Sequence, residues 1–228
     1  NRIVALAMAD SDAEGVLFLD QDSGVPRKSV ANLLTTYKRL KQDSRLRVGV
    51  LSGVAMRSDG LPYRLYPVAQ GADTVAGVHS VRMTPSSFSL IPTQALKVVG
   101  RFYDDFFIDH IDVDYCYRCR AQGYLVAIDP SAPFPHQIGH GLVFVLGFPV
   151  TPISSPFRHY YQVRNIILSA RRRGVPWFSA LAEVVKRFVV IGVLGLKAGS
   201  LSTRYRYALM GLVHGIGGNG GPMTKKRR

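Results

Sequence analysis

Two aspartates near the N-terminus have the type and spacing of a divalent-metal site. Asp20 and Asp22 follow the short apolar run of residues 16–19, with one residue between them. This run predicts a strand buried on both faces, and open α/β sheets bind their ligands at the carboxyl ends of strands. Two carboxylates at this spacing can both reach one hard cation such as Mg²⁺ or Mn²⁺. The alternative is an Asx-turn that leads into the next helix, since Asp is a favoured turn residue.

A second acidic cluster holds Asp109, Asp112 and Asp114 at the start of a helix predicted over residues 110–122. Asp109 as the N-cap, with Asp112 three residues later, resembles a capping arrangement. Three aspartates within six residues repel one another, however, and capping requires only one or two. Residues two apart on a helix point about 200° apart. We therefore expect one of Asp112 and Asp114 to face a cleft as a general base and the other to make structural bonds.

His136 follows these clusters in a segment rich in proline and glycine, which predicts a loop. A lone histidine in a loop is by default a surface residue or one with satisfied hydrogen bonds. A role as a metal ligand arises for His136 only if Asp20 and Asp22 already hold a metal.

A fourth group lies on one face of a basic helix predicted over residues 157–173. An arginine pair with tyrosine and asparagine on one face suits two-pronged recognition of phosphate. A solvated basic helix whose tyrosines pack against the core is the equal alternative. The residues are Arg158, Tyr161, Arg164 and Asn165.

Apolar runs alternate with amphipathic segments over the first 130 or so residues, which predicts an α/β sandwich with a mostly parallel sheet. The predicted strands cover residues 16–19, 47–51, 77–83 and 124–128, and the predicted helices cover residues 1–14, 28–42, 93–99 and 110–122. Three basic amphipathic helices are expected at residues 157–173, 177–190 and 202–214, with a flexible tail from about residue 217.

Charge divides the chain into two regions. Residues 1–150 carry 15 basic and 14 acidic side chains, whereas residues 151–228 carry 14 basic side chains and 1 acidic one, Glu183. We expect a domain over residues 1–150 and a basic helical extension over residues 151–228 that faces an anionic partner. Mean hydropathy is +0.09. The sequence has no apolar run of the roughly 18 residues that a bilayer-spanning helix needs, which excludes a polytopic membrane protein.

The two cysteines, Cys116 and Cys119, have a C-x-x-C spacing. A structural zinc site requires four ligands, and the sequence has no second cysteine pair. We expect reduced, partly buried thiols and a reducing cytosolic environment.

Four ordered motifs resemble those of glycosyltransferase family 2, specifically its bacterial rhamnosyltransferase-type branch, over nearly the whole chain. They are Asp20-Gln21-Asp22-Ser23, then Phe107-Ile108-Asp109-x-x-Asp112-x-Asp114-x-Cys116-x-Arg118, then His136-x-x-Gly139, and finally Arg158-x-Tyr160-Tyr161-x-x-Arg164-Asn165. The resemblance implies a GT-A-like nucleotide-diphospho-sugar transferase fold, in which a mixed, mostly parallel sheet is flanked by helices. Residues 1–150 would then form a partial catalytic domain.

The resemblance also implies an activity. An inverting glycosyltransferase would move a sugar, rhamnose at the family level, from a nucleotide-diphosphate sugar to a hydroxyl of a bacterial glycan or lipid-linked saccharide. Asp112 matches the family's general base. Asp20 and Asp22 match the pair that holds Mg²⁺ or Mn²⁺ and the donor diphosphate, and His136 matches a histidine that completes the metal site. Arg158, Tyr161, Arg164 and Asn165 are expected to bind the donor, and Asp109 and Asp114 the acceptor.

Three features depart from the family pattern. The chain has Ser87-Phe88-Ser89 where the family has a Ser-Gly-Ser-like turn. Asp114 stands where Glu is common, which shortens the side chain by one methylene. The family's first strand–helix–strand unit, which holds the nucleobase, would precede Asn1.

Two other functions fit parts of the sequence. A strand that ends in D-x-D also describes a haloacid-dehalogenase-type phosphatase, but that family needs Thr or Val two positions after the second Asp, where this chain has Gly24. A basic nucleic-acid-binding module would use residues 151–228. Their helices combine basic with apolar residues, which favours an anionic membrane surface over nucleic acid. We expect a cytoplasmic protein that is peripheral at the inner face of the plasma membrane.

Overall fold

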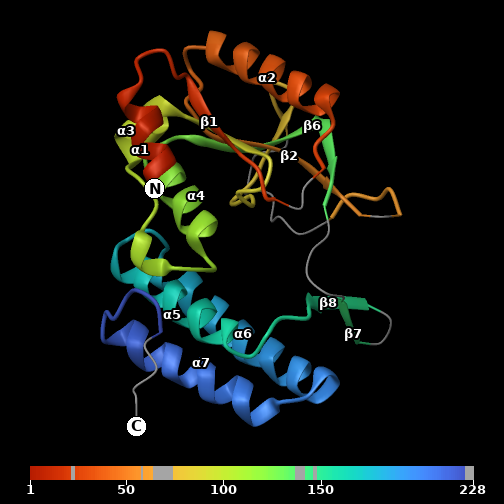
Figure 1. The fold of residues 1–228 in the computed structure, drawn as a ribbon, viewed down its shortest axis with the longest axis vertical. Helices are drawn as coiled ribbons and strands as arrows, with labels where there is room; N and C mark the ends of the chain where they lie inside the picture. The colour runs from red at the N-terminus through yellow and green to blue at the C-terminus, as the bar shows by residue number, and fades with distance from the viewer. Residues whose placement is uncertain (22–23, 58, 64–73, 137–141, 146–147, 224–228) are drawn as a thin grey trace. The chain divides into compact units, whose positions relative to one another are not determined.

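The computed structural model describes residues 1–21, 24–57, 59–63, 74–136, 142–145 and 148–223 (Figure 1). The chain divides into two compact units. The first unit comprises residues 1–102 and 115–137, and the second comprises residues 103–114 and 138–228. The boundaries therefore differ from the predicted one at residue 150, because the acidic segment belongs to the same unit as the C-terminal helices.

The first unit is built on a sheet of six described strands in the order β1-β5-β2-β6-β4-β3. β5 is antiparallel to both β1 and β2, β6 is parallel to β2, and β4 is antiparallel to β6 and β3. The strands are β1 (Gly15–Phe18), β2 (Val48–Met56), β3 (Thr74–Val75), β4 (Val78–Ser80), β5 (Ser89–Pro92) and β6 (Leu125–Pro135). The α/β class and the mixed sheet are confirmed. The prediction of a mostly parallel sheet is wrong for the described strands, since only β2 and β6 pair in parallel.

Helices cover both faces of this sheet (Figure 1). Successive residues of a strand point to opposite faces, so Val50 joins the core on one face and Leu51 the core on the other. Helix α2 covers the second face, where Leu33 is fully buried, which contributes about 2 kcal/mol. The helices are α1 (Arg2–Ala9), α2 (Arg27–Gln42), α3 (Thr93–Val99) and α4 (Ile111–Ala121). Cys116 and Cys119 of α4 are buried free thiols in the first core, as predicted.

The second unit is mainly helical. Its elements are the 3₁₀ turn η1 (Asp104–Phe106), the start of α4, the antiparallel pair β7 (Leu142–Val145) and β8 (Phe148–Pro152), and the helices α5 (Arg158–Arg171), α6 (Trp177–Ala198) and α7 (Leu201–Ile216). α5 is buried along most of its length. A Cβ on Gly211 would lie 2.3 Å from the carbonyl oxygen of Tyr160, so the absence of a side chain there lets α7 approach α5 closely.

The described part of the predicted flexible tail is held in place. Beyond α7, the backbone N–H of Gly221 donates to the carbonyl of Asp105, and the backbone N–H of Met223 donates to the hydroxyl of Tyr161. The prediction of a flexible tail is therefore wrong for residues 217–223, and residues 224–228 lie outside the described part of the chain.

Candidate functional site

Three strands of the first unit end at the same edge of the sheet. β1, β2 and β6 run in one direction, since β5 is antiparallel to β1 and β2 while β6 is parallel to β2. Phe18 of β1 and Ser52 of β2 are both opposite Ser89 of β5, which aligns the two strands. Asp20 follows β1 beyond this row, at the carboxyl edge where ligands of such sheets bind.

Asp20 is exposed, and its carboxylate has no partner among the described residues. Its predicted companion Asp22 lies outside those residues. His136 follows directly after β6 at the same edge, where it is half-buried, packs against the ring of Phe134 and donates its backbone N–H to the carbonyl of Met56 at 3.0 Å.

The donor chemistry at this edge fits Mg²⁺ or Mn²⁺, although the described residues contain no group of three or more His, Cys, Asp or Glu side chains that could hold a metal ion. Mg²⁺ is commonly bound through one or two carboxylates, with waters and substrate phosphates completing its shell. The exposed carboxylate of Asp20 suits such a partial shell.

Asp129 is a buried carboxylate at this edge that the sequence analysis did not select. It lies opposite Gly53, where the register between β6 and β2 shifts. Its Oδ1 accepts bonds from the backbone N–H and the hydroxyl of Ser131, at 2.9 and 2.7 Å, while its buried Oδ2 has no hydrogen-bond partner among the described residues. Its position directly after the apolar end of a predicted strand, as with Asp20, is the signal that could have identified it.

The segment before α4 has a strained backbone. Phe107, Asp109 and His110 have φ angles of 62°, 65° and 65°, in the left-handed region that residues with a Cβ avoid. Such residues cost about 1–3 kcal/mol each and persist only where surrounding contacts hold them. Those contacts come from α5.

Asn165 and Arg164 of α5 hold this segment through its backbone carbonyls. The amide nitrogen of Asn165 donates to the carbonyls of Phe106, Ile108 and Asp109 at 3.0, 2.8 and 2.8 Å. Arg164 donates through Nη2 to the carbonyl of Phe106 and through Nε to the side-chain oxygen of Asn165, both at 2.9 Å. Both side chains are fully buried. In this structure the polar atoms of these two residues are bonded to the protein's own backbone and to each other, and their role in donor binding stays a prediction.

Tyr161 and Arg158 complete the set predicted on α5. Tyr161 is buried, and its hydroxyl accepts a hydrogen bond from the backbone N–H of Met223. Its role in donor binding stays a prediction. The side chain of Arg158 is 41% exposed and forms an ion pair with the carboxylate of Asp109. Its Nε donates to Oδ2 at 3.0 Å, and its Nη2 donates to Oδ1 at 2.5 Å. This pairing raises the pKa of Arg158, with burial acting in the opposite direction.

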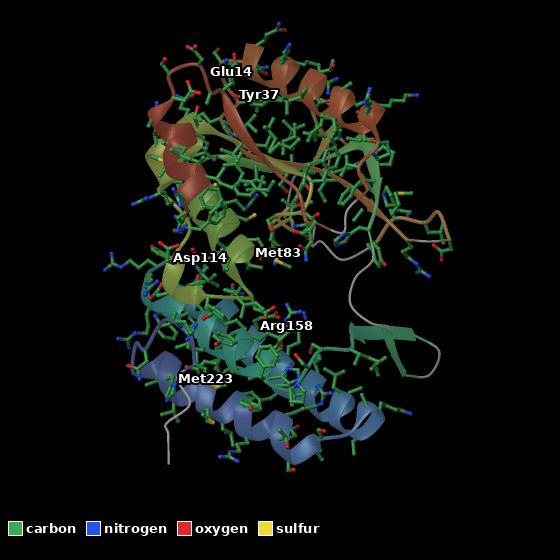
Figure 2. The ribbon with its side chains drawn as sticks, in the orientation of Figure 1. Glu14, Tyr37, Met83, Asp114, Arg158 and Met223 are labelled. Carbon is green, nitrogen blue, oxygen red and sulfur yellow. The ribbon has the colours of Figure 1, made fainter. Side chains whose placement is uncertain are left out.

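Asp112 and Asp114 have different environments in the first turn of α4. Asp114, which Figure 2 labels, is buried. It accepts a bond of 2.5 Å from the hydroxyl of Ser169 on α5. It therefore makes a structural bond, and its contact with the acceptor stays a prediction. Asp112, about 200° around the helix, is half-buried, and its Oδ1 accepts the backbone N–H of Val113 at 2.9 Å.

His110 lies between Asp109 and α4 with its Nε2 buried and without a hydrogen-bond partner among the described residues. Burial lowers the pKa of its imidazole to about 3, and the charge of Arg187 on α6 acts in the same direction. The ring is therefore neutral at physiological pH.

The structure brings the acidic segment and the α5 residues together in the second unit. Asp109, Arg158, Arg164 and Asn165 form one bonded network, and Asp114 is bonded separately to Ser169 of α5. Asp20 and His136 belong to the first unit. These bonds hold the start of α4, and so the position of Asp112, through side chains 49 or more residues further along the chain.

No family model matches the chain. The chain is 29% identical over 185 residues to the dTDP-rhamnosyl transferase RfbF of Shigella flexneri, which covers 77% of this chain and 60% of that protein. The chain thus spans less than two thirds of the length of this relative. Among solved structures, it is similar to the crystal structure of GalNAc-T7 with UDP, GalNAc and Mn²⁺, with a TM-score of 0.49 and 12% sequence identity over 95% of this chain and 42% of that chain.

Proposed function

Because the sequence match supports the predicted assignment to glycosyltransferase family 2, rhamnosyltransferase-type, we propose that the protein is an inverting glycosyltransferase. Its donor is a nucleotide-diphosphate sugar, for which the name of the S. flexneri relative points to dTDP-rhamnose. Its acceptor is a hydroxyl of a saccharide or of a lipid-linked saccharide.

One observation supports the role of Asp112 as the general base. The carboxylate of Asp114 is hydrogen-bonded to the hydroxyl of Ser169 inside the second unit, whereas Asp112 lies on the opposite side of the same helical turn. The N-terminus of a helix favours a negatively charged carboxylate. A carboxylate at position 112 is thus suited to take a proton, and of the two aspartates in the first turn of α4 it is the one that is not fully buried.

The proposed step is a single displacement. The acceptor oxygen forms a bond to the anomeric carbon as the bond from that carbon to the diphosphate oxygen breaks. The acceptor's proton passes to the carboxylate of Asp112, and the diphosphate leaves with the electron pair. An aspartate is basic enough because the proton moves late, when the hydroxyl has become acidic.

Asp20, Asp22 and His136 are the residues proposed to hold a divalent cation. When bound, the cation supplies positive charge that offsets the negative charge developing on the departing diphosphate. The exposed carboxylate of Asp20 at the carboxyl edge of the sheet supports this assignment.

The α5 residues have a positioning role in this proposal. Asn165 and Arg164 fix the backbone that leads into the first turn of α4, and Arg158 fixes the side chain of Asp109. Of these three, Arg158 remains partly exposed, so it is the one that can also contact a diphosphate.

The test is a donor screen with the full-length native protein. We expect release of nucleoside diphosphate from dTDP-rhamnose in the presence of Mg²⁺ or Mn²⁺, above that from a panel of other sugar nucleotides, with further stimulation by a saccharide acceptor. Turnover of a phosphomonoester through a phospho-aspartate, with no release from any sugar nucleotide, would overturn the proposal in favour of a phosphatase.

A further inference from the structure

The outward side of α6 is apolar along its whole length. Its exposed large apolar residues recur at spacings of three, four and seven residues, which aligns them in one stripe on the helix. A helix on a protein surface normally carries polar residues on the side that faces solvent. The stripe comprises Trp177 (57% exposed), Phe178 (89%), Leu181 (64%), Val185 (56%), Val189 (63%) and Leu196 (78%).

The opposite side of α6 already serves the protein core. Ile191 and Leu194 are buried there, and Ile191 packs with Val163 of α5 and Ala208 of α7. α6 therefore has two apolar sides, of which the described residues cover one. The stripe is additional to what the fold of the second unit requires.

Positive charges are exposed on the same two helices. They are Lys186 and Lys197 of α6 and Arg206 of α7. The acidic residue of these two helices, Glu183, is already paired with Lys186 and Arg187 at 3.5 and 3.0 Å. The surface of these helices is thus complementary to an anionic partner and repels a cationic one.

α7 carries a shorter stripe of the same composition. Leu209, Val213 and Ile216 are 51%, 66% and 60% exposed, and Arg206 precedes them at the same helical spacing. The two helices are joined by a short connection at residues 199–200.

We propose that the exposed stripe of α6, assisted by that of α7, binds the surface of an anionic lipid bilayer. The apolar side chains enter the boundary between headgroups and acyl chains, and the exposed Lys and Arg side chains contact the lipid phosphates. Trp177, at the first position of α6, suits this boundary because an indole ring is apolar with one polar edge.

The described part of the chain has no helix with the length and apolar character to pass through a bilayer. A second copy of the chain is the other way to cover such a stripe, and it fits less well. A second copy of the chain would bring two basic surfaces together, since residues 151–228 carry 14 basic side chains and 1 acidic one. A lipid surface accepts both the apolar stripe and the positive charge of these helices.

Vesicle binding tests the proposal directly, because Trp177 is the single tryptophan of the chain. We expect the full-length protein to float with vesicles of phosphatidylcholine mixed with phosphatidylglycerol, and to float less with phosphatidylcholine alone. On binding, the emission of Trp177 should shift to shorter wavelength and become protected from iodide quenching. Added salt should weaken the binding.

Matched variants distinguish binding through the stripe from nonspecific adsorption to vesicles. The double variant Phe178→Ser, Leu196→Ser should weaken vesicle binding by about tenfold or more, since lost burial of apolar area lowers interfacial affinity. The control pair Ile3→Ser, Leu6→Ser changes residues of α1 that are 70% and 65% exposed, and it should leave binding unchanged. Both pairs should unfold near the temperature of the unaltered protein, because the replaced side chains are exposed.

Two outcomes would overturn the proposal. One is vesicle binding by the Phe178→Ser, Leu196→Ser variant that equals binding by the control pair. The other is self-association of the protein without lipid, measured by sedimentation, that the same stripe variant abolishes, since a second copy of the chain would then cover the stripe. Neither readout involves sugar transfer, so failure here leaves the proposed activity standing, and failure of that activity leaves the membrane surface standing.

Discussion

Arg158 at the start of α5 binds both carboxylate oxygens of Asp109, a residue 49 positions earlier in a left-handed backbone conformation. The pair ties the loop before α4 to the helix that carries Asn165. Its effect is geometric, because it holds a strained segment whose last residues lead into the first turn of α4. The segment that this pair holds leads directly to Asp112, the proposed general base.

Replacing Arg158 with Lys tests whether catalysis requires the two hydrogen bonds to Asp109 or only the positive charge. Lys keeps the positive charge but cannot form two parallel bonds. We expect kcat to fall by about tenfold or more, as displacement of a catalytic group does, with the donor KM nearly unchanged. Steady-state kinetics over a range of donor concentrations measures both constants. A raised donor KM with unaltered kcat would instead assign Arg158 to the donor diphosphate.

Asp112→Asn should abolish turnover and leave donor binding intact, because the amide cannot accept the acceptor's proton. The loss of a general base commonly costs about 10²–10⁴ in rate. Transfer kinetics and calorimetric titration of the donor measure the two effects. Asp12→Asn, an exposed position on the first unit, is the matched control. A near-normal rate in Asp112→Asn would remove this residue from the mechanism.

Asp20→Ala should weaken metal binding and donor binding together, since one carboxylate is proposed to hold the cation that meets the diphosphate. Titration of Mn²⁺ by electron paramagnetic resonance, with and without the nucleoside diphosphate, measures this loss. Asp59→Ala, which removes an exposed aspartate paired with Arg57, should leave the titration unaltered. Unchanged Mn²⁺ affinity in Asp20→Ala argues against the metal site.

Asn165→Ala should destabilise the protein by about 1–3 kcal/mol, because it leaves buried carbonyls without donors. The loss should also lower kcat, since the segment before α4 is strained and depends on this amide. Urea unfolding and kinetics measure the two quantities. Asn32→Ala is the control, because Asn32 also donates to one carbonyl, that of Ser131, but through an exposed hydrogen bond. A stable Asn165→Ala variant with full activity would show that α5 does not position α4.

His110 should make stability depend on pH between the ordinary pKa of histidine and its native value of about 3. The unfolded chain binds a proton near pH 6.5 while the native ring stays neutral, so stability is full above that pH and falls as the pH is lowered. Between pH 7.5 and 5.5 this group accounts for a loss of about 1.4 kcal/mol.

His110→Asn removes this titration and suits the position, because asparagine tolerates a left-handed φ. The unfolding free energies of both proteins at pH 7.5 and 5.5 measure the difference between them. An equal fall in stability for the two proteins would show that His110 does not titrate on unfolding.

Several local elements could be predicted from the sequence because their boundaries are encoded locally. α3 has the predicted range, Thr93–Val99, since Pro92 precedes it and Gly100 ends it with a positive φ of 89°. α2 begins within one residue of the prediction for the same reason, as Pro26 fixes its start. The apolar periodicity of the three C-terminal helices also predicted their existence.

Other elements depend on pairing with distant residues. β2 continues to Met56, well beyond the predicted end at residue 51, because its second half pairs with β6 on the other side of a register shift. β5, the short segment Ser89–Pro92, was not predicted at all. Its insertion between β1 and β2 is what makes the sheet largely antiparallel. A four-residue run that contains Ser and Pro has no periodicity of its own to reveal it.

The sequence by itself determined which side chains could do chemistry: the two aspartates after β1, the acidic start of α4, and the polar face of α5. The tertiary structure alone decided which of them turn inward. Asp114, Arg164 and Asn165 were predicted as site residues from their type and spacing, yet the fold buries them against Ser169 and the carbonyls of residues 105–109. The reason is that burial without a partner is costly for a polar group, and partners more than fifty residues away exist only once the chain has folded.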